Sequence, residues 1–460
     1  MTKEYEYKTE NAWKKTSQDD IFSYADQYMD YLNHSKTERE SVCYSEKIAK
    51  DNGFVALDTL SSVKPGDKIY ITHRGKNILL AVIGNKPVTE GIRMVASHID
   101  CPRLDLKQQP LHEEKELAFL RTHYYGGVKK YQWVTRPLAI HGTVAFKDGR
   151  ELPIAIGDEG MPYGFVITDL LPHFAREQMK KTMAEGVTGE ALQLLCGSIP
   201  GEEEKDAVKQ NILAILNREY GITEADFLSA ELSAVPAENA RSIGFDQSLI
   251  GAYGQDDRVC SYAALHALLN VGVPEYTSVC LLIDKEEIGS AGLTGMRSRF
   301  FEYAMMAILE KTGATEYSAL MHMLFHSACL SGDVTAGVDP LYAEVHEAQN
   351  AAKIGHGIAV CKFTGAGGKS GASDADASTM AAFRAMMDEN NVCWQSCELG
   401  KIDAGGGGTI SQYIAQLGMP TLDAGTPVLS MHAPYEITSK ADCYHTMLSY
   451  KAFYESTIQM

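Results

Sequence analysis

The sequence lacks long apolar runs and has few basic residues, and both absences limit what the protein can do. No stretch approaches the about 18 uninterrupted apolar residues of a membrane-spanning helix. The first eight residues, Met1–Lys8, contain no apolar core of a signal peptide. The 42 lysines and arginines are outnumbered by 60 aspartates and glutamates, for a net charge of −18. Such a chain repels phosphate backbones, so we expect neither nucleic acid nor a membrane as a partner.

Motifs for disulfide or nucleophile chemistry are also missing. The ten cysteines are scattered and form no Cys-x-x-Cys pair, which in a large chain indicates reduced thiols and a cytoplasmic location. No Gly-x-Ser-x-Gly elbow marks a serine hydrolase. A cysteine nucleophile at Cys101, beside His98, is a weaker interpretation than the metal motif described below.

What the sequence does contain is an alternation of strand and helix patterns. A length of 460 residues suggests two or three domains. Apolar residues at helical spacing follow Thr16–Asp20, and buried strands are predicted at 92–97 and 277–283. Further helices are expected at 259–269 and 292–309. This alternation predicts an α/β fold, a three-layer αβα sandwich around a central sheet.

The middle of the chain has a different texture. From about Leu104 to Val235, short β-like runs alternate with turns, and two helices are expected near 175–185 and 207–220. We interpret residues 105–235 as a β-rich domain inserted into a domain formed by 1–104 and 236–460.

Acids and histidines repeatedly follow apolar runs. These positions are His98 with Asp100, Asp256 with Asp257, Glu286 with Glu287, Asp333, and His432. In α/β proteins, ligands collect outside the carboxyl ends of the strands. Histidine nitrogen and carboxylate oxygen are the ligands of hydrolytic zinc sites, and two cations about 3.5–4 Å apart need a bridging carboxylate. The acids and histidines at these positions supply the ligands for two cations, and one acid remains that could act as a proton shuttle.

Each position also has an ordinary structural interpretation. Taken alone, His98 is more often a satisfied core histidine, and His432 fits simple packing. The run Asp256–Arg258 fits a helix cap with a paired arginine, and Asp333 fits a turn after Gly332. From the single residues, the metal-binding and the structural interpretations both stay open. The order and spacing of these residues along the chain are more informative.

That order resembles the aspartyl aminopeptidase family of dizinc exopeptidases over nearly the whole chain. The matching stretches are Ala96–Pro102 (ASHIDCP), Asp256–Arg258 (DDR), Asp284–Ser290 (DKEEIGS), Ser331–Asp333 (SGD), Gly407–Ile410 (GGTI) and Leu422–His432 (LDAGTPVLSMH).

The resemblance implies a metal-binding role for five residues. Asp256 matches the carboxylate that bridges both metals, and the peptide bond after it is often cis in such enzymes. His98 and Asp333 would complete one metal site, and Glu287 and His432 the other. The implied cofactor is two divalent metal ions per subunit, zinc in first place, with manganese or cobalt as alternatives.

Four further residues take roles from the same resemblance. Glu286 matches the general base, with Asp100 behind His98. Lys362 falls close to a lysine that faces an acidic substrate side chain, and His173 lies in a loop that in the family reaches a neighbouring subunit's active site. The family assembles as tetrahedral dodecamers, so we expect a homododecamer in which the inserted domain serves oligomerisation.

The chain departs from the family near the expected substrate pocket. Ala336 and Asp339 stand where two histidines are usual, and the stretch 362–369 is unusually rich in glycine. A further carboxylate there would disfavour acidic substrate side chains by like-charge repulsion. The preferred N-terminal residue is therefore left open.

Taken together, the sequence predicts a metal-dependent aminopeptidase that releases N-terminal amino acids from peptides. A metal-activated water would attack the peptide, with a glutamate as base. The alternatives are a related dizinc amidohydrolase or deacylase, or a non-catalytic peptide-binding shell protein of the same fold.

Overall fold

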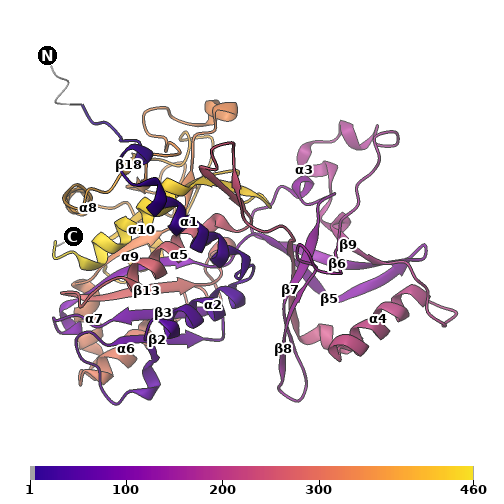
Figure 1. Cartoon of the computed structure of the whole chain (residues 1–460), viewed down its shortest axis with the longest axis horizontal. Coiled ribbons are helices and arrows are strands. Elements are labelled where there is room, and N and C mark those ends of the chain that lie inside the picture. Colours follow the sequence, from indigo (N-terminus) through magenta and orange to yellow (C-terminus); the bar gives the residue numbers. More distant parts are fainter. Residues whose placement is uncertain (1–5, 459) are drawn as a thin grey trace.

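The chain folds into two lobes that lie side by side (Figure 1). The computed structural model describes residues 6–458 and 460. Residues 1–5, on which part of the signal-peptide prediction rests, lie outside the described residues. Within the described chain, none of the helices combines the length and hydrophobicity needed to cross a bilayer.

A nine-stranded sheet forms the centre of the larger lobe. In spatial order its strands are β1 (Val55–Ala56), β2 (Lys68–His73), β3 (Asn77–Val82), β13 (Thr277–Ile283), β4 (Ile92–His98), β14 (Ala328–Gly332), β20 (Thr421–Gly425), β16 (Ile358–Cys361) and β18 (Trp394–Cys397). The four central strands β13, β4, β14 and β20 are parallel. Their registers pair Ile283 with His98 and Gly332 with Ser97, so the carboxyl ends of three neighbouring strands meet at one edge.

Helices cover both faces of this sheet. One face carries α1 (Gln18–Asn33), α2 (Glu38–Asp51), α5 (Gln255–Leu269), α8 (Ala377–Glu389) and α10 (Lys440–Glu455). The other face carries α6 (Phe300–Lys311), α7 (Tyr317–Phe325) and α9 (Ser411–Ala415). Each face has its own apolar core, because strands covered on both sides are hydrophobic throughout. The predicted three-layer sandwich is confirmed.

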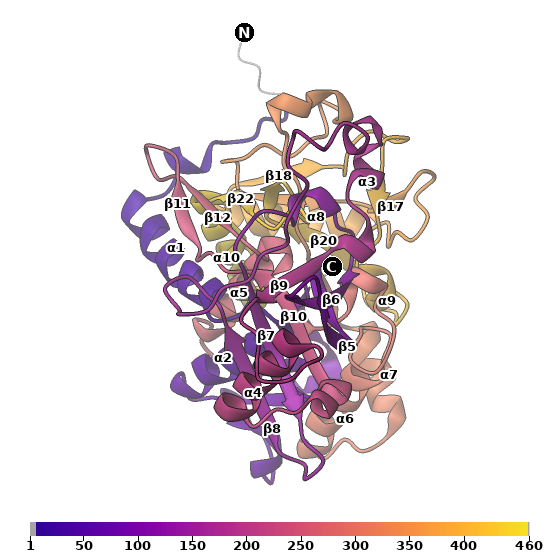
Figure 2. The ribbon, with the colours of Figure 1, turned by 90° about the vertical axis from the view of Figure 1, so that its right-hand side faces the viewer.

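The smaller lobe is built on a second, antiparallel sheet of six strands. Their spatial order is β8 (Glu151–Ile156), β7 (Leu138–Ala145), β10 (Ala230–Pro236), β5 (Arg103–Glu114), β6 (Leu117–Tyr125) and β9 (Gln193–Gly197). Helix α4 (Ala207–Tyr220) packs on it, and a separate apolar core lies between them. Figure 2 views the molecule from the side of this lobe. The arrangement is consistent with an inserted domain at 105–235.

Two small sheets complete the fold. One is formed by β11 (Arg241–Ile243), β12 (Leu249–Ala252), β22 (Glu436–Ser439), β21 (Pro427–Leu429) and β15 (Thr335–Ala336). The other pairs β17 (Gly365–Ala366) with β19 (Gly406–Gly407). Their strands are too short to show a hydrophobic alternation, so the sequence patterns did not indicate them.

Two predicted helices are wrong in extent. Near 175–185 only α3 (Met183–Gly186) is helical by α criteria, because the residues before it are mostly exposed and offer no apolar stripe to pack. Helix α6 begins only at Phe300 rather than near 292. Gly292 has a φ of +91°, and a Cβ at Gly295 would lie 2.2 Å from the Ser290 carbonyl oxygen, so a tight turn occupies this segment.

A buried charge network joins the two lobes beside the start of α2. The Lys36 ammonium lies 2.7 Å from Asp158 Oδ1 and donates to the main-chain oxygen of Pro236 at 3.0 Å. The His141 ring contacts Glu40 Oε1 through Nδ1 at 2.7 Å and Asp158 Oδ1 through Nε2 at 3.0 Å. Because these groups come from both lobes, the network fixes one lobe against the other.

Protonation of His141 makes the stability of the fold depend on pH. Burial alone would lower the pKa of His141, but Asp158 and Glu40 outweigh it and raise the pKa to about 9. Since the ordinary value is about 6.5, the stabilisation is complete below that pH and is lost as the pH rises through about 9. At low pH, the protonated His141 contributes on the order of 3 kcal/mol to the free energy of unfolding.

We therefore expect His141→Gln to lower the free energy of unfolding at pH 6.5 and to do so much less at pH 9.5. Urea titrations of the variant and the unsubstituted protein at both pH values measure the difference. The exposed His322, replaced by glutamine, is the matched control. A destabilisation by His141→Gln that is equal at both pH values would contradict the assignment.

Candidate active site

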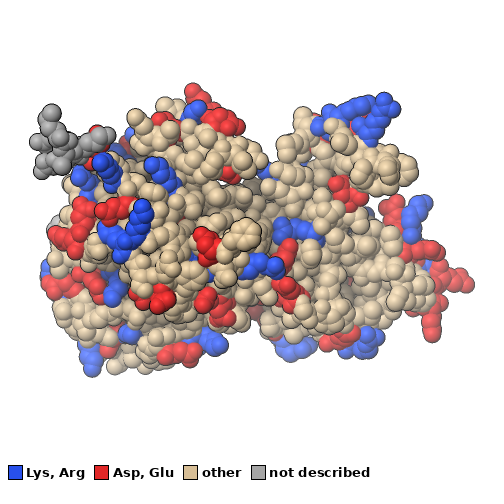
Figure 3. Space-filling model, turned by 45° about the horizontal axis from the view of Figure 1, so that its top comes forward, with Lys and Arg blue, Asp and Glu red and all other residues tan. Residues whose placement is uncertain are grey.

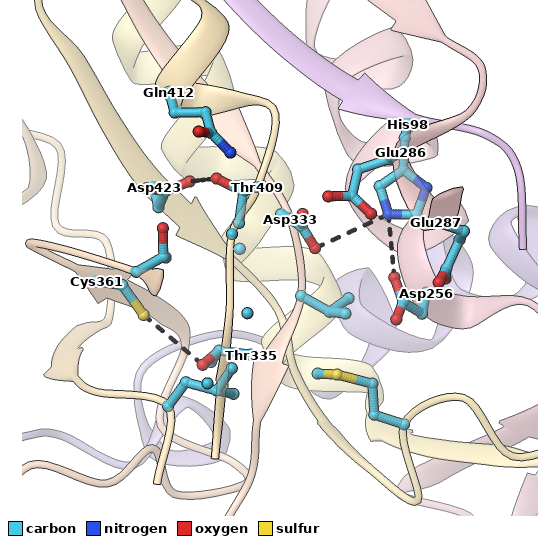
Figure 4. A pocket seen from close by; sticks show the side chains of 18 of the residues that line it. His98, Asp256, Glu286, Glu287, Asp333, Thr335, Cys361, Thr409, Gln412 and Asp423 are labelled. Carbon is cyan, nitrogen blue, oxygen red and sulfur yellow. Dashed lines mark hydrogen bonds and ion pairs between the residues drawn. The ribbon is translucent and has the colours of Figure 1, made fainter. Parts of the chain in front are cut away.

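A cavity of about 510 Å³ opens where the central strands end. Its lining includes His98 at the end of β4, Glu286 and Glu287 after β13, Asp333 after β14 and His432 after β21. Figure 4 shows Asp256, Glu286, Glu287 and Asp333 gathered with His98 at one end of this cavity. The strand register explains the gathering, since the carboxyl ends of parallel neighbours share one edge of the sheet.

Three of these side chains form a first group around His98. Its Nε2 lies 3.2 Å from Asp256 Oδ1 and 3.9 Å from Asp333 Oδ1. One ligand atom from each residue lies within 4.8 Å of the others, so the three can hold a metal ion. His98 and Asp256 are buried, and Asp333 is partly exposed to the cavity.

A second group forms around His432. Its Nε2 lies 3.1 Å from Asp256 Oδ2 and 3.5 Å from Glu287 Oε2, again with ligand atoms within 4.8 Å of one another. Asp256 therefore belongs to both groups, and each of its oxygens faces a different histidine. The peptide bond between Asp256 and Asp257 is cis.

The turn that carries Asp256 is held from several sides. Gly254 has a φ of +76°, and a Cβ there would lie 2.1 Å from Arg258 Nη1, so a larger residue would strain the backbone and displace the Arg258 side chain. Ser97 on β4 donates to Asp257 Oδ2 at 2.6 Å. Arg258 donates to the main-chain oxygen of Ile99 at 3.3 Å, which ties the start of α5 to the chain after β4.

Asp100 connects His98 to the two glutamates. Its carboxylate accepts hydrogen bonds from the main-chain N–H groups of Glu286 and Glu287, at 3.1 and 3.2 Å. The hydroxyl of Tyr125 donates to Asp100 Oδ2 at 2.7 Å. His98 Nδ1 donates to the Asp100 main-chain oxygen at 3.0 Å, which leaves Nε2 facing Asp256.

Sequence reasoning missed two residues of this framework. Tyr125 comes from β6 of the smaller lobe, and Glu436 accepts from the main-chain N–H groups of Asp256 at 3.0 Å and His432 at 2.8 Å. The signal for Glu436 was available, because it follows His432 by only four residues. No local pattern around Tyr125 indicates a contact with Asp100, which is 25 residues away.

The acidic side chains around His98 and His432 form an excess of buried negative charge. Burial, together with the Asp100 and Asp256 carboxylates, raises the pKa of Glu286 to about 7. Burial also raises the pKa of Glu287 and Asp333. Burial opposes protonation of His432, but Asp256 and Glu287 outweigh it and raise its pKa to about 10. Such a cluster favours bound cations, which would offset the repulsion between the carboxylates.

The structure does not bring Lys362 or His173 into the cavity. Lys362 is absent from the cavity lining and places its ammonium 2.8 Å from Asp374 Oδ1. His173 is exposed on a loop of the smaller lobe. Within one chain, therefore, the seven other predicted site residues come together and these two do not.

Comparisons with known proteins place this site in context. Residues 31–454 match the family described as Aminopeptidase I zinc metalloprotease (M18). A Borrelia garinii protein described as a probable M18 family aminopeptidase 1 is 45% identical over 456 residues, covering 97% of this chain and 100% of that protein. The crystal structure of an M18 family aminopeptidase from Thermotoga maritima has a TM-score of 0.95 and 43% identity, covering 98% of this chain and all of that one. The crystal structure of aminopeptidase I from Clostridium acetobutylicum has a TM-score of 0.90 and 43% identity, and the match again covers 98% of this chain and all of that one.

The hydrogen bond from Tyr125 to Asp100 yields a testable consequence. We expect Tyr125→Phe to lower the free energy of unfolding by about 2 kcal/mol, since a buried carboxylate loses a donor. Chemical denaturation measures the change. Tyr124→Phe, at the neighbouring exposed position, is the control and should stay within about 0.5 kcal/mol of the unsubstituted protein. Equal stability of both variants would contradict the role given to this bond.

Proposed function

The chain belongs to the M18 family of zinc aminopeptidases, and from this premise we propose that it releases N-terminal residues from peptides with two metal ions and a glutamate base. The observation that carries the proposal is the double position of Asp256. One of its oxygens faces His98 at 3.2 Å and the other faces His432 at 3.1 Å. A carboxylate shared in this way suits a pair of cations better than a single one.

The side chains fit the cations that the family description implies. His98, Asp256 and Asp333 would hold one ion, and Asp256, Glu287 and His432 the other. Glu287 Oε1 is buried and has no hydrogen-bond partner among the described residues, as expected of an atom reserved for a ligand. When bound, the cations would polarise the scissile carbonyl and acidify a water molecule.

Glu286 is the proposed general base. It lines the cavity beside both groups but belongs to neither, so its carboxylate is free to accept a proton. The proton would then pass from Glu286 to the nitrogen of the leaving peptide, which makes the same group base and acid in turn.

Asp100 is proposed as a positioning residue rather than a catalytic one. It holds the His98 ring through its main-chain oxygen, and it holds the peptides of Glu286 and Glu287 through its carboxylate. Outer partners of this kind set the orientation of metal-binding histidines. One aspartate thereby sets the distance between the proposed base and the proposed metal ligands.

We expect Glu286→Gln to lower turnover of leucine 4-nitroanilide by at least 100-fold, because an amide cannot accept the proton. Zinc content by plasma emission spectrometry and thermal unfolding should stay unchanged. Glu389→Gln, an exposed position on α8, is the control and should keep full activity. N-acetylated leucine 4-nitroanilide should resist the unsubstituted enzyme, whereas cleavage of that compound would favour a deacylase or another amidohydrolase.

Self-association is the second part of the proposal. The loop around His173 exposes several apolar side chains, among them Phe174 at 73%, Met179 at 78% and Met183 at 68%. An exposed apolar cluster on a soluble protein indicates a surface that another chain covers. A yeast protein with the same fold, 20% identical with a TM-score of 0.74, is described as a dodecamer. We therefore propose a homo-oligomer, a dodecamer by analogy, in which His173 reaches the cavity of a neighbouring subunit.

Two variants of this loop separate assembly from catalysis. Replacing both Phe174 and Met179 by aspartate should yield smaller particles in size-exclusion chromatography with light scattering, because burying two charges in an interface is unfavourable. His173→Ala should keep the mass of the oligomer and lose most of the turnover. A monomeric unsubstituted protein, or a fully active His173→Ala oligomer, would contradict the respective part of the proposal.

A further inference from the structure

Two cysteine side chains meet beside the cavity, on neighbouring strands of the central sheet. Cys361 is the last residue of β16 and Cys397 the last of β18, and the register of these parallel strands pairs the two residues directly. Their sulfur atoms lie 3.2 Å apart, and both side chains are buried. Neighbouring strands lie about 4.8 Å apart, within the about 4.4–6.8 Å between Cα atoms that a disulfide spans. A bond between the two sulfur atoms is therefore compatible with the backbone.

The first of the two thiols lies within reach of small molecules that enter the cavity. Cys361 belongs to the lining of the cavity, and Cys397 lies on the next strand outward, at the edge of the sheet. Figure 4 shows Cys361 beside Thr335, whose hydroxyl oxygen lies 3.7 Å from the Cys361 sulfur and 3.9 Å from the Cys397 sulfur. A reagent in the cavity can thus react with Cys361, which has Cys397 in contact with it.

The surroundings of Cys361 favour a small, uncharged oxidant. The side chain is only 4% exposed, which keeps a bulky reagent such as oxidised glutathione away from its sulfur. The described residues that line the cavity include five acids and no lysine or arginine, so an anionic oxidant would meet like charge. Figure 3 shows acidic and basic side chains mixed over the outer face, so this one-sided charge is a property of the cavity. Hydrogen peroxide meets both requirements.

The two cysteines lie where their strands lead into one wall of the cavity. The chain after Cys361 runs through β17, the chain after Cys397 runs through β19, and these two short strands pair with each other. The same two segments line the cavity with Thr364, Leu399 and residues 406–408. A covalent bond between the sulfur atoms would join the roots of both segments and restrict the wall that they form.

We propose that Cys361 and Cys397 are a site of reversible oxidation, at which hydrogen peroxide converts the two thiols into a disulfide and thereby lowers turnover. The Cys361 sulfur attacks one peroxide oxygen, the O–O bond breaks, and water leaves with the thiol proton, which gives a sulfenic acid. The Cys397 sulfur then attacks the sulfur of Cys361, the S–O bond breaks, and a second water leaves. Two thiols thus lose two electrons and two protons, and one peroxide becomes two waters.

The oxidation is expected to be slow. Cys397 and burial raise the pKa of the Cys361 thiol, so little thiolate is present at neutral pH. Because the thiolate is the nucleophile, the disulfide would accumulate under a sustained supply of oxidant. The effect on turnover rests on the proposed aminopeptidase function, whereas formation of the disulfide does not.

Treatment of the full-length, zinc-loaded enzyme with excess hydrogen peroxide tests the proposal. Mass spectrometry of unreduced peptides should find the peptides of Cys361 and Cys397 joined, with two hydrogens lost. We expect kcat/KM for leucine 4-nitroanilide to fall about tenfold, since a displacement of about 1 Å can cost up to about 100-fold. Dithiothreitol should restore the activity. This recovery separates the disulfide from oxidation of Met431, which also lines the cavity and whose sulfoxide needs a dedicated reductase.

Cys397→Ser is the test variant, and Cys393→Ser, at another buried cysteine of the same segment, is the matched control. Cys397→Ser should keep its turnover before treatment and form no linked peptide. Activity that it loses to excess peroxide should not return with dithiothreitol, because a sulfenic acid without a partner thiol is oxidised further to a sulfinic acid. Cys393→Ser should behave like the unsubstituted protein.

Three results would overturn the proposal. They are no linked peptide in the treated unsubstituted protein, a linked peptide with unchanged kcat/KM, and the same loss and recovery of activity in Cys397→Ser as in the unsubstituted protein. If the untreated enzyme cleaves no aminoacyl anilide, the proposed function is wrong, and the effect on turnover is wrong with it. The linked peptide is measured independently of activity, so the two failures are distinguishable.

Discussion

The repulsion among carboxylates buried in one place is the constraint on which the structure of the site depends. Asp100, Asp256, Glu286, Glu287 and Asp333 lie at a single edge of the sheet, largely out of contact with water. Unpaired charges in such surroundings are strongly unfavourable. The chain compensates part of this charge with its own donors, the main-chain N–H groups and the Tyr125 hydroxyl that point at Asp100. The remainder, centred on Asp256, is the charge that metal ions would neutralise.

The same constraint gives the smaller lobe a role at the site. Besides Tyr125, the chain just after β6 brings Gly127, whose main-chain oxygen accepts from His432 Nδ1 at 3.0 Å. That contact turns His432 Nε2 toward Asp256 and Glu287. The charge network of Lys36, His141 and Asp158 fixes the lobe that supplies these groups. A displacement of one lobe against the other would thus disturb the orientation of His432 without any change in the central sheet.

The sequence indicates the parts of this arrangement that depend on local patterns. Strand β13 and helix α4 end where the sequence patterns predict, because β13 is apolar from Val279 to its end and α4 has a helical pattern. His98, Asp256, Glu287, Asp333 and His432 were identifiable because each follows a recognisable run and their order matches a family. Tyr125 was not, since its importance arises only from a contact between two lobes. The segment near 175–185 was misjudged for another reason, since its mostly exposed residues offer no apolar stripe on which a longer helix could pack.

Two parts of the cavity differ in how closely their residues are constrained, the cluster around Asp256 and the remaining wall. The cluster around Asp256 must satisfy strict requirements of charge and geometry, so few residue types fit at each position and the sequence reveals it. The wall of the cavity near Gln412 is formed mostly by uncharged side chains, and many combinations of residues could build such a wall. Lys362 does not contribute to this wall, because its ammonium lies 2.8 Å from Asp374 Oδ1 outside the cavity. The acids and histidines of the cluster are therefore easier to predict from the sequence than the remaining wall of the cavity, whose uncharged residues follow no recognisable pattern.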